Sequence, residues 1–174
     1  MGMNPQTIGK TMPHGFAGSY ARQPDMIVAT RPAGGTVPIL FGTPLKYDAA
    51  GAVVPMGEGD SGPAFAGIAA REIKSSLNYL DQDVGSYAPG EAVSVFQRGC
   101  INVRCQNGTP KLGGAVYVRL AADEDNPAAV PGGFEAVEGG GSPAGSVKLD
   151  NCQWAGPADA GGVAELRILA MQNA

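Results

Sequence analysis

The segment AVSVFQRGCINVRC, residues 92–105, carries the clearest strand pattern of the chain. In its second half Ile101 and Val103 alternate with Asn102 and Arg104, and its first half alternates valine with serine in the same way. A period of two residues is typical of a strand that turns one face to a core and the other to solvent. The segment therefore predicts a sheet and rules against a long helix at the centre of the chain.

Shorter stretches with strand-forming residues lie on both sides of this segment. They are residues 26–30, 37–41, 45–47, 52–54, 64–70, 116–119 and 165–168, with a weak one at 134–137. Glycine and proline number 27 and 14 among 174 residues, and both oppose helix interiors. The sequence predicts an all-β fold, a single barrel or jelly-roll-like sandwich of roughly eight to ten short strands. The order of the strands, and so the choice between barrel and sandwich, stays open.

The composition changes along the chain in two places. Residues 1–24 show no sustained period, and we expect an extended N-terminal arm that orders against a neighbour or remains a frayed tail. Residues 25–174 then form a single β-rich domain. Within it, residues 121–146 are acidic and then rich in Gly, Pro and Ala, which predicts an excursion over the surface.

The charge balance and the N-terminus restrict the possible partners. Twelve basic and sixteen acidic residues give a net charge of −4, so no nucleic-acid-binding surface is expected. No stretch of eighteen apolar residues occurs, and no membrane span is expected. The N-terminus lacks the apolar core of a secretory signal. We therefore expect that the protein is made and kept in a reducing cytoplasm, or leaves it only inside a larger assembly.

The stretch GEGDSGPA, residues 57–64, approaches the pattern that surrounds the nucleophilic serine of chymotrypsin-like proteases. A nucleophile at Ser61 would need a general base, and the single histidine of the chain, His14, lies in the expected arm. We therefore interpret the stretch as a turn in which Asp60 and Ser61 hydrogen-bond the local backbone. No other residues form a catalytic set, and the sequence predicts no enzyme.

Cys100, Cys105 and Cys152 are the three cysteines. The first two are five residues apart, and on one strand an odd separation places them on opposite faces. Without a CxxC pair, and with one histidine, they match no zinc pattern. We expect three structural thiols, no metal and no cofactor.

Four segments of the chain resemble one known family in the order in which that family has them. They are GFAGSYARQPDMIVATRP (15–32), FAGIAAREIKSS (65–76), YAPGEAVSVFQRGCINVRC (87–105) and GTPKLGGAVYVR (108–119). Together they resemble the structural cement proteins of tailed phages, which decorate the head. The resemblance covers most of residues 15–120 and does not extend clearly into 121–174.

The resemblance implies a capsid decoration protein that binds the outside of the mature head and clamps neighbouring major capsid subunits together. It implies the phage major capsid protein as partner, a homo-oligomer (dimer or trimer) on the capsid, a location on the virion surface and synthesis in the host cytoplasm. Within the arm, Phe16, Tyr20 and Arg22 are residue types enriched at interfaces, and we expect them to act as anchors. The alternative is a β-rich module that binds carbohydrate or a host surface; such modules present exposed aromatic side chains, and here aromatic residues make up only 6%.

Overall fold

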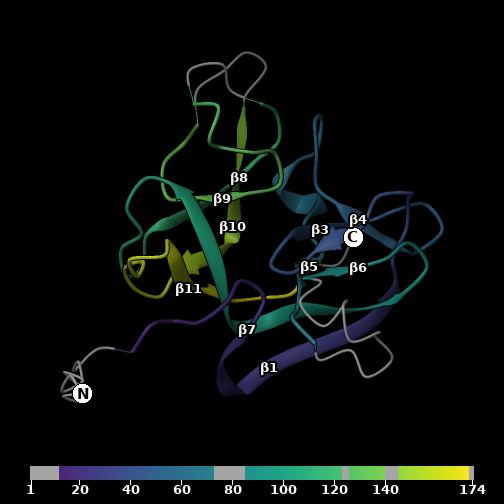
Figure 1. Ribbon diagram of the computed structural model, residues 1–174, viewed down its shortest axis with the longest axis horizontal. Helices are drawn as coiled ribbons and strands as arrows, with labels where there is room; N and C mark the ends of the chain where they lie inside the picture. The colour runs from purple at the N-terminus through teal and green to yellow at the C-terminus, as the bar shows by residue number, and fades with distance from the viewer. Residues whose placement is uncertain (1–11, 73–84, 123–125, 140–144, 173–174) are drawn as a thin grey trace, which may run out of the picture.

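A computed structural model describes residues 12–72, 85–122, 126–139 and 145–172 (Figure 1). Residues 1–11 of the expected arm, 73–76 of the second resembling segment, and 123–125 and 140–144 of the expected excursion lie outside the described residues. The strands of the described part are β1 (Tyr20–Pro32), β2 (Ile39–Leu40), β3 (Pro44–Tyr47), β4 (Val53–Pro55), β5 (Gly67–Ala69), β6 (Ser86–Tyr87), β7 (Ala92–Asn107), β8 (Ala115–Arg119), β9 (Phe134–Glu135), β10 (Ser146–Trp154) and β11 (Val163–Ile168). One 3₁₀ turn, η1 (Gly62–Ala64), precedes β5.

Strand β7 organises the whole molecule, as its sequence pattern suggested. One edge of β7 pairs first with β1 and then, farther along the strand, with β9. The other edge pairs first with β5 and then with β11. Its two ends therefore belong to different groups of strands, which Figure 1 shows on either side of the molecule. The segment of clearest alternation is the strand with the most neighbours.

The C-terminal end of β7 closes a barrel. In the described residues the hydrogen-bonded circuit runs β7, β11, β10, β8, β9 and back to β7. The all-β prediction is confirmed, and the structure selects the barrel from the two alternatives. Closure removes the unpaired edges that an open sheet would present.

A bend at Gly99 lets β7 serve two cores. Gly99 has φ +107°, and a Cβ there would lie 2.5 Å from the carbonyl oxygen of Asp25. Just before it, the pairing with β1 shifts register between Ile27 and Val28. Residues of the same parity therefore face different cores on the two sides of the bend. Val93 packs in a smaller cluster with Leu45 and Tyr87, whereas Ile101 and Val103 lie in the barrel core.

The sequence predicted some of the individual strands and missed others. The hairpin of residues 45–54 is present, with Tyr47 of β3 opposite Val53 of β4. The longest omission is β10, which no sequence pattern indicated. It contains Asp150 and Asn151, which are poor strand formers, and its pairing with β8 is irregular after Leu149.

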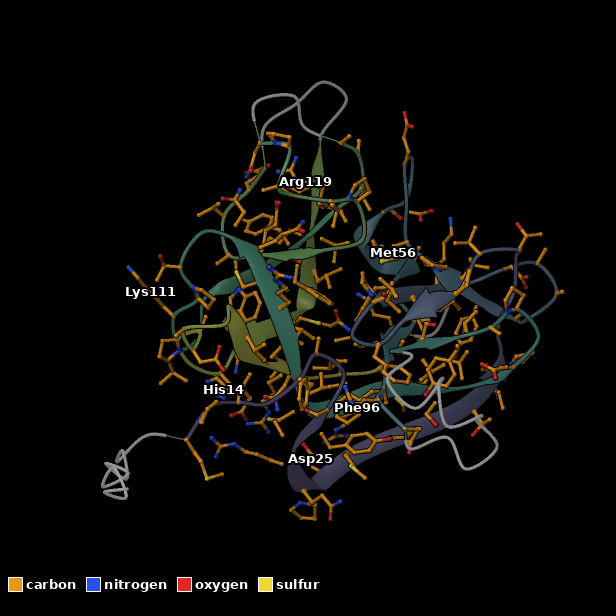
Figure 2. All side chains as sticks on the ribbon, in the orientation of Figure 1. His14, Asp25, Met56, Phe96, Lys111 and Arg119 are labelled. Carbon is orange, nitrogen blue, oxygen red and sulfur yellow. The ribbon has the colours of Figure 1, made fainter. Side chains whose placement is uncertain are left out.

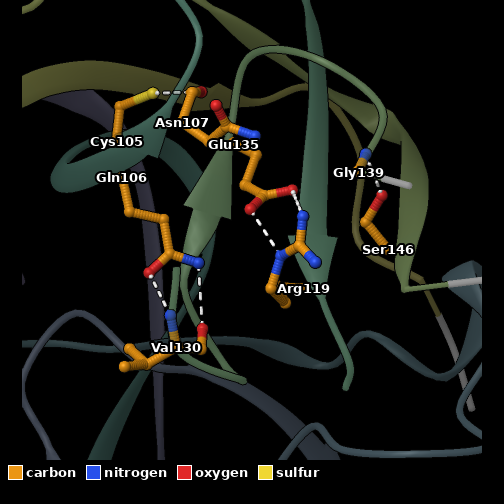
Figure 3. A network of polar contacts seen from close by, with 8 residues as sticks. All are labelled: Cys105, Gln106, Asn107, Arg119, Val130, Glu135, Gly139 and Ser146. Atoms are coloured by element: carbon orange, nitrogen blue, oxygen red, sulfur yellow. Dashed lines mark hydrogen bonds and ion pairs between the residues drawn. The ribbon is translucent and has the colours of Figure 1, made fainter. Parts of the chain in front are cut away.

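Within residues 121–146, where a surface excursion was expected, polar contacts hold the described part, as Figure 3 shows. The Gln106 side chain donates to the carbonyl of Val130 (2.9 Å) and accepts from its N–H (3.1 Å). Ser146 Oγ accepts from the N–H of Gly139 at 2.7 Å. Its weak predicted strand is present as β9.

In the part of the chain that the structure describes, no helix has the length and apolar character needed to cross a membrane.

Candidate functional site

The N-terminal segment 12–19 lies along the outer face of the barrel before it enters β1. Asn102 of β7 holds it: the side-chain amide donates to the carbonyl of His14 (2.7 Å) and to Ser19 Oγ (3.0 Å). The main chain of Asn102 adds two bonds, accepting from the N–H of Gly18 (2.7 Å) and donating to Ser19 (2.9 Å). The segment therefore buries Asn102, whose position in the alternating pattern had indicated solvent.

A second contact comes from the loop between β10 and β11. Asp159 accepts through Oδ1 from the N–H groups of Gly161 (2.9 Å) and Val163 (3.0 Å), and through Oδ2 from that of His14 (3.1 Å). These backbone donors, Val163 first, hold the pKa of Asp159 below its ordinary value. The carboxylate thus joins its own loop to the N-terminal segment.

Strand β1 begins at Tyr20, inside the range 1–24 assigned to the arm from sequence. The reason is pairing with β7, where Tyr20 lies opposite Ile101 and Arg22 opposite Cys100. The three expected anchors therefore lie on a segment that is fastened to the barrel.

Phe16 is the expected anchor whose aromatic ring is exposed. Its side chain is 65% exposed, and the guanidinium carbon of Arg71 lies 4.5 Å from its ring centroid. The same guanidinium lies 5.9 Å from the ring of Phe41. An exposed aromatic ring beside an exposed cation combines an apolar surface with a positive charge.

Tyr20 contributes mainly to the protein's own packing. Its ring lies 5.8 Å from that of Phe96 and packs against the barrel core. Its hydroxyl donates to Glu72 Oε1. Burial, followed by this carboxylate, raises the pKa of Tyr20 above its ordinary value.

Arg22 forms a two-pronged ion pair with Glu165 of β11. Nε and Nη2 donate to the two carboxylate oxygens at 2.6 and 3.1 Å. Hydrogen bonding to Glu165 raises the pKa of Arg22 above its ordinary value. The Arg22 side chain remains 69% exposed while that of Glu165 is 8% exposed, so the guanidinium forms the outer surface of the pair.

Ser61 and His14 occupy separate parts of the structure. Ser61 is exposed at the start of η1, and its side chain makes no capping hydrogen bond, contrary to expectation. Asp60 does bond the backbone, accepting from the N–H of Gly57 at 2.8 Å, and it also pairs with Lys46. His14, labelled in Figure 2, has its Nε2 atom 3.2 Å from the carbonyl of Pro157, on the β10–β11 loop.

The cysteines are free thiols placed in or beside the barrel core. Cys105 and Cys152 contact that core, while Cys100 lies under the Arg22–Glu165 pair. Burial raises the pKa of all three thiols, that of Cys100 to about 11. Among the described residues, no three His, Cys, Asp or Glu side chains are grouped so that they could hold a metal ion.

The aromatic side chains bear on the carbohydrate-binding alternative. Trp154 is fully buried in the barrel, and of the described aromatic side chains Phe16 alone is exposed. The described surface therefore has no cluster of aromatic rings on which a sugar could stack.

One known protein family matches almost the whole chain. The family model of the structural cement protein (E217 gp24/Pam3 gp6) matches residues 4–169. The chain belongs to this structural cement protein family. The matched range goes beyond residues 15–120, where the sequence resemblance lies, and includes β10 and β11.

A solved structure has the same fold. A chain of the structure described as the capsid of Myoviridae phage XM1 superposes with a TM-score of 0.67 at 18% identity, covering 92% of this chain and 94% of that chain. No curated protein matches the chain.

The sequence suggested Phe16, Tyr20 and Arg22 as candidate anchors but gave no indication of the residues that contact them or their segment. Asn102 and Glu165 occupy outward positions of alternating strands, where charged or polar residues are ordinary. Arg71 follows a small apolar strand. No local signal distinguishes such residues, because their partners are distant in sequence, by 143 positions for Arg22 and Glu165.

Proposed function

We propose that this protein binds the outside of a phage head and stabilises the contacts between neighbouring major capsid subunits, acting by binding alone. The observation that supports this most directly is the match of the cement family model across residues 4–169, on a fold that also occurs in a phage capsid. Such a protein binds the assembled shell and not its free subunits. It therefore stabilises the shell by mass action.

The described surface supports a binding role in a second way. Phe16 is exposed beside Arg71, and Arg22 presents its guanidinium above a nearly buried Glu165. Aromatic and arginine side chains are enriched among residues that dominate binding energy. We propose Phe16, Tyr20 and Arg22 as contact residues, with Tyr20 positioning the segment through its packing on Phe96.

The remaining parts of the proposal concern assembly and location. The protein acts as a homo-oligomer on the virion surface after synthesis in the host cytoplasm. The residues ahead of β1 serve as the arm, and the β-rich domain begins with β1 at Tyr20 and not at residue 25.

The test uses phage heads assembled without this protein. Purified protein is added, and cryo-electron microscopy of the heads is expected to show new density outside the shell that bridges capsid subunits. Decorated heads should also withstand a higher temperature before releasing their contents. Heads that gain neither density nor heat resistance would overturn the proposal.

The contact residues are tested in the same assay. Phe16→Ala is expected to weaken head binding on the order of tenfold, because a central aromatic anchor contributes about 1–2 kcal/mol or more. Val37→Ala is the matched control, since Val37 is 68% exposed and outside the N-terminal segment. Equal binding by both variants would remove Phe16 from the interface while leaving the capsid role standing.

A further inference from the structure

Strand β1 has an open edge along part of its length. It is thirteen residues long, and in the described part of the chain its only strand partner is β7. Figure 1 shows β1 along the outer border of the molecule, next to β7. Long unpaired edges favour pairing with another chain, so native proteins normally cover or block them.

The hydrogen bonds show which β1 residues direct their backbone N–H and C=O groups away from β7. Ala33 directs both backbone groups toward the β7 side, donating to Glu91 (2.7 Å) and accepting from Gly90 (2.9 Å). The register from Pro32 back to Val28 is uninterrupted, and in an antiparallel ladder every second residue points the same way. Val28 and Thr30 therefore turn their N–H and C=O groups away from β7.

A check comes from the other side of β7. Ser94, which lies opposite Thr30, accepts from the N–H of Ala70 at 2.8 Å and so points away from β1. Among the described residues, no strand pairs with the N–H and C=O groups of Val28 and Thr30 that point away from β7. The contact seen there is a hydrogen bond from Arg31 Nη1 to the carbonyl of Thr30 (3.1 Å).

We propose that this edge pairs with the same edge of a second copy, antiparallel, with Val28 on the two-fold axis. Thr30 then exchanges backbone hydrogen bonds with Met26 of the partner subunit, and Val28 with Val28 of the partner subunit. On the outer face Ile27, 38% exposed, meets Ala29 of the partner subunit, twice by symmetry. The result is one sheet that continues through both subunits.

Charge complementarity selects a second copy as the occupant. The same register brings Arg31 opposite Asp25 of the partner subunit, and symmetry repeats this contact. Within one subunit Asp25 also pairs with Arg98 (3.1 Å) and Arg167 (3.5 Å), so Arg31 would be a further cation on that carboxylate. Opposite charges across a strand pair are favourable. A shift by one residue in each subunit would instead place Arg31 beside Ile27 and bring Pro32, which has no N–H, into the ladder.

This inference rests on the homo-oligomer of the proposed function and names the surface through which two subunits pair. The first experiment measures mass by light scattering of the full chain at ~100 µM, since a dimer depends on protomer concentration. A mass of twice 17.6 kDa is expected. A monomer at this concentration would overturn the proposal.

The register is tested by cross-linking. Residues across an antiparallel hydrogen-bonded pair lie about 5.5 Å apart between Cα atoms, within the range of a disulfide. Val28→Cys should therefore give a covalent dimer on mild oxidation. Thr30→Cys is the matched control on the same edge, because the two Thr30 residues would be roughly 13 Å apart along the strand. Cross-linking of Thr30→Cys and not of Val28→Cys would overturn the register.

A charge variant avoids any effect of substituting Val28. Arg31→Glu places a carboxylate opposite Asp25 of the partner subunit twice, and dimer dissociation should become about tenfold easier. Arg104→Glu is the control, because Arg104 is exposed and pairs with Val163 of β11. Equal dissociation constants for the two variants would contradict the proposal.

Head binding is scored separately, with the parent chain. A parent chain that dimerises through β1 but leaves heads undecorated would overturn the proposed function, whereas a parent chain that stays monomeric and still decorates heads would overturn only the dimer.

Discussion

Arg119 and Glu135 form an ion pair from which solvent is completely excluded. Nε and Nη2 of Arg119 donate to the two carboxylate oxygens at 2.6 and 3.1 Å, and both side chains have 0% exposure. The main chain at Gly139 lies so close that a Cβ there would be 2.0 Å from Nη2 (Figure 3). The pair therefore joins β8, β9 and the end of the excursion.

We expect Glu135→Gln to lower the free energy of unfolding by about 3–5 kcal/mol, because it removes the negative charge that accepts from Nε and Nη2 of the fully buried Arg119. Urea unfolding measures the change. Asp150→Asn is the control, since it removes one member of the exposed Lys148–Asp150 pair and should cost less than about 1 kcal/mol. Equal losses in the two variants would show that burial of the pair has no energetic role.

Gly62, the second glycine of the GDSG stretch, packs directly on β10, which leaves no room for a larger side chain. A Cβ at this position would lie 2.5 Å from the carbonyl oxygen of Lys148. Gly62→Ala should destabilise the fold by about 1–3 kcal/mol through overpacking, and Gly62→Val by more. Gly57→Ala is the matched control, because a Cβ there meets nothing within 4 Å.

Ser61→Ala completes this set and should leave stability within about 0.5 kcal/mol of the parent, since Ser61 is exposed and makes no cap bond. Thermal unfolding of all four variants measures the differences. A Gly57 variant as damaged as the Gly62 variant would point to lost backbone freedom and not to contact with Lys148.

We expect Asp159 to make attachment of the N-terminal segment dependent on pH. Its pKa is lowered in the folded protein, so its contribution is fully present above the ordinary value of 3.8 and is lost as pH falls through the lower folded value. Amide exchange of His14 and Val163, corrected for the intrinsic rate, should therefore quicken as the pH falls below 3.8.

Two comparisons isolate that carboxylate. The amide of Ala33 donates to a backbone carbonyl, which does not titrate in this range, and should keep its protection. In Asp159→Asn the protection of His14 should no longer change with pH. A pH dependence that survives in this variant would assign the effect to another group.

The thiols should be nearly inert in the folded protein. Burial raises the pKa of Cys100 to about 11 and also raises those of Cys105 and Cys152, so little thiolate exists at pH 8. A thiol-specific chromogenic reagent should react slowly with native protein and quickly with all three cysteines in denaturant. Rapid reaction of one thiol in native protein would identify a reactive site that the structure does not explain.

Much of the fold follows from short-range pattern. The alternation of residues 92–105 identified the strand that pairs with the most others, and the turn residues between 45 and 54 located a true hairpin. The richness in Gly and Pro excluded a helical fold. These features depend on backbone geometry over a few residues, which sequence records directly.

The chain by itself therefore determined the all-β class, the main strands, the family resemblance and the candidate anchors. Only the tertiary structure decided that the strands close into a barrel, because closure depends on pairing between β7 and β11, far apart in sequence. It also placed Arg22 on Glu165 and the His14 amide on Asp159, and directed the backbone N–H and C=O groups of Val28 and Thr30 away from β7. The physical reason is the same in each case: burial and hydrogen-bond direction depend on the neighbour that a residue meets in space, and a local period of two residues does not specify that neighbour.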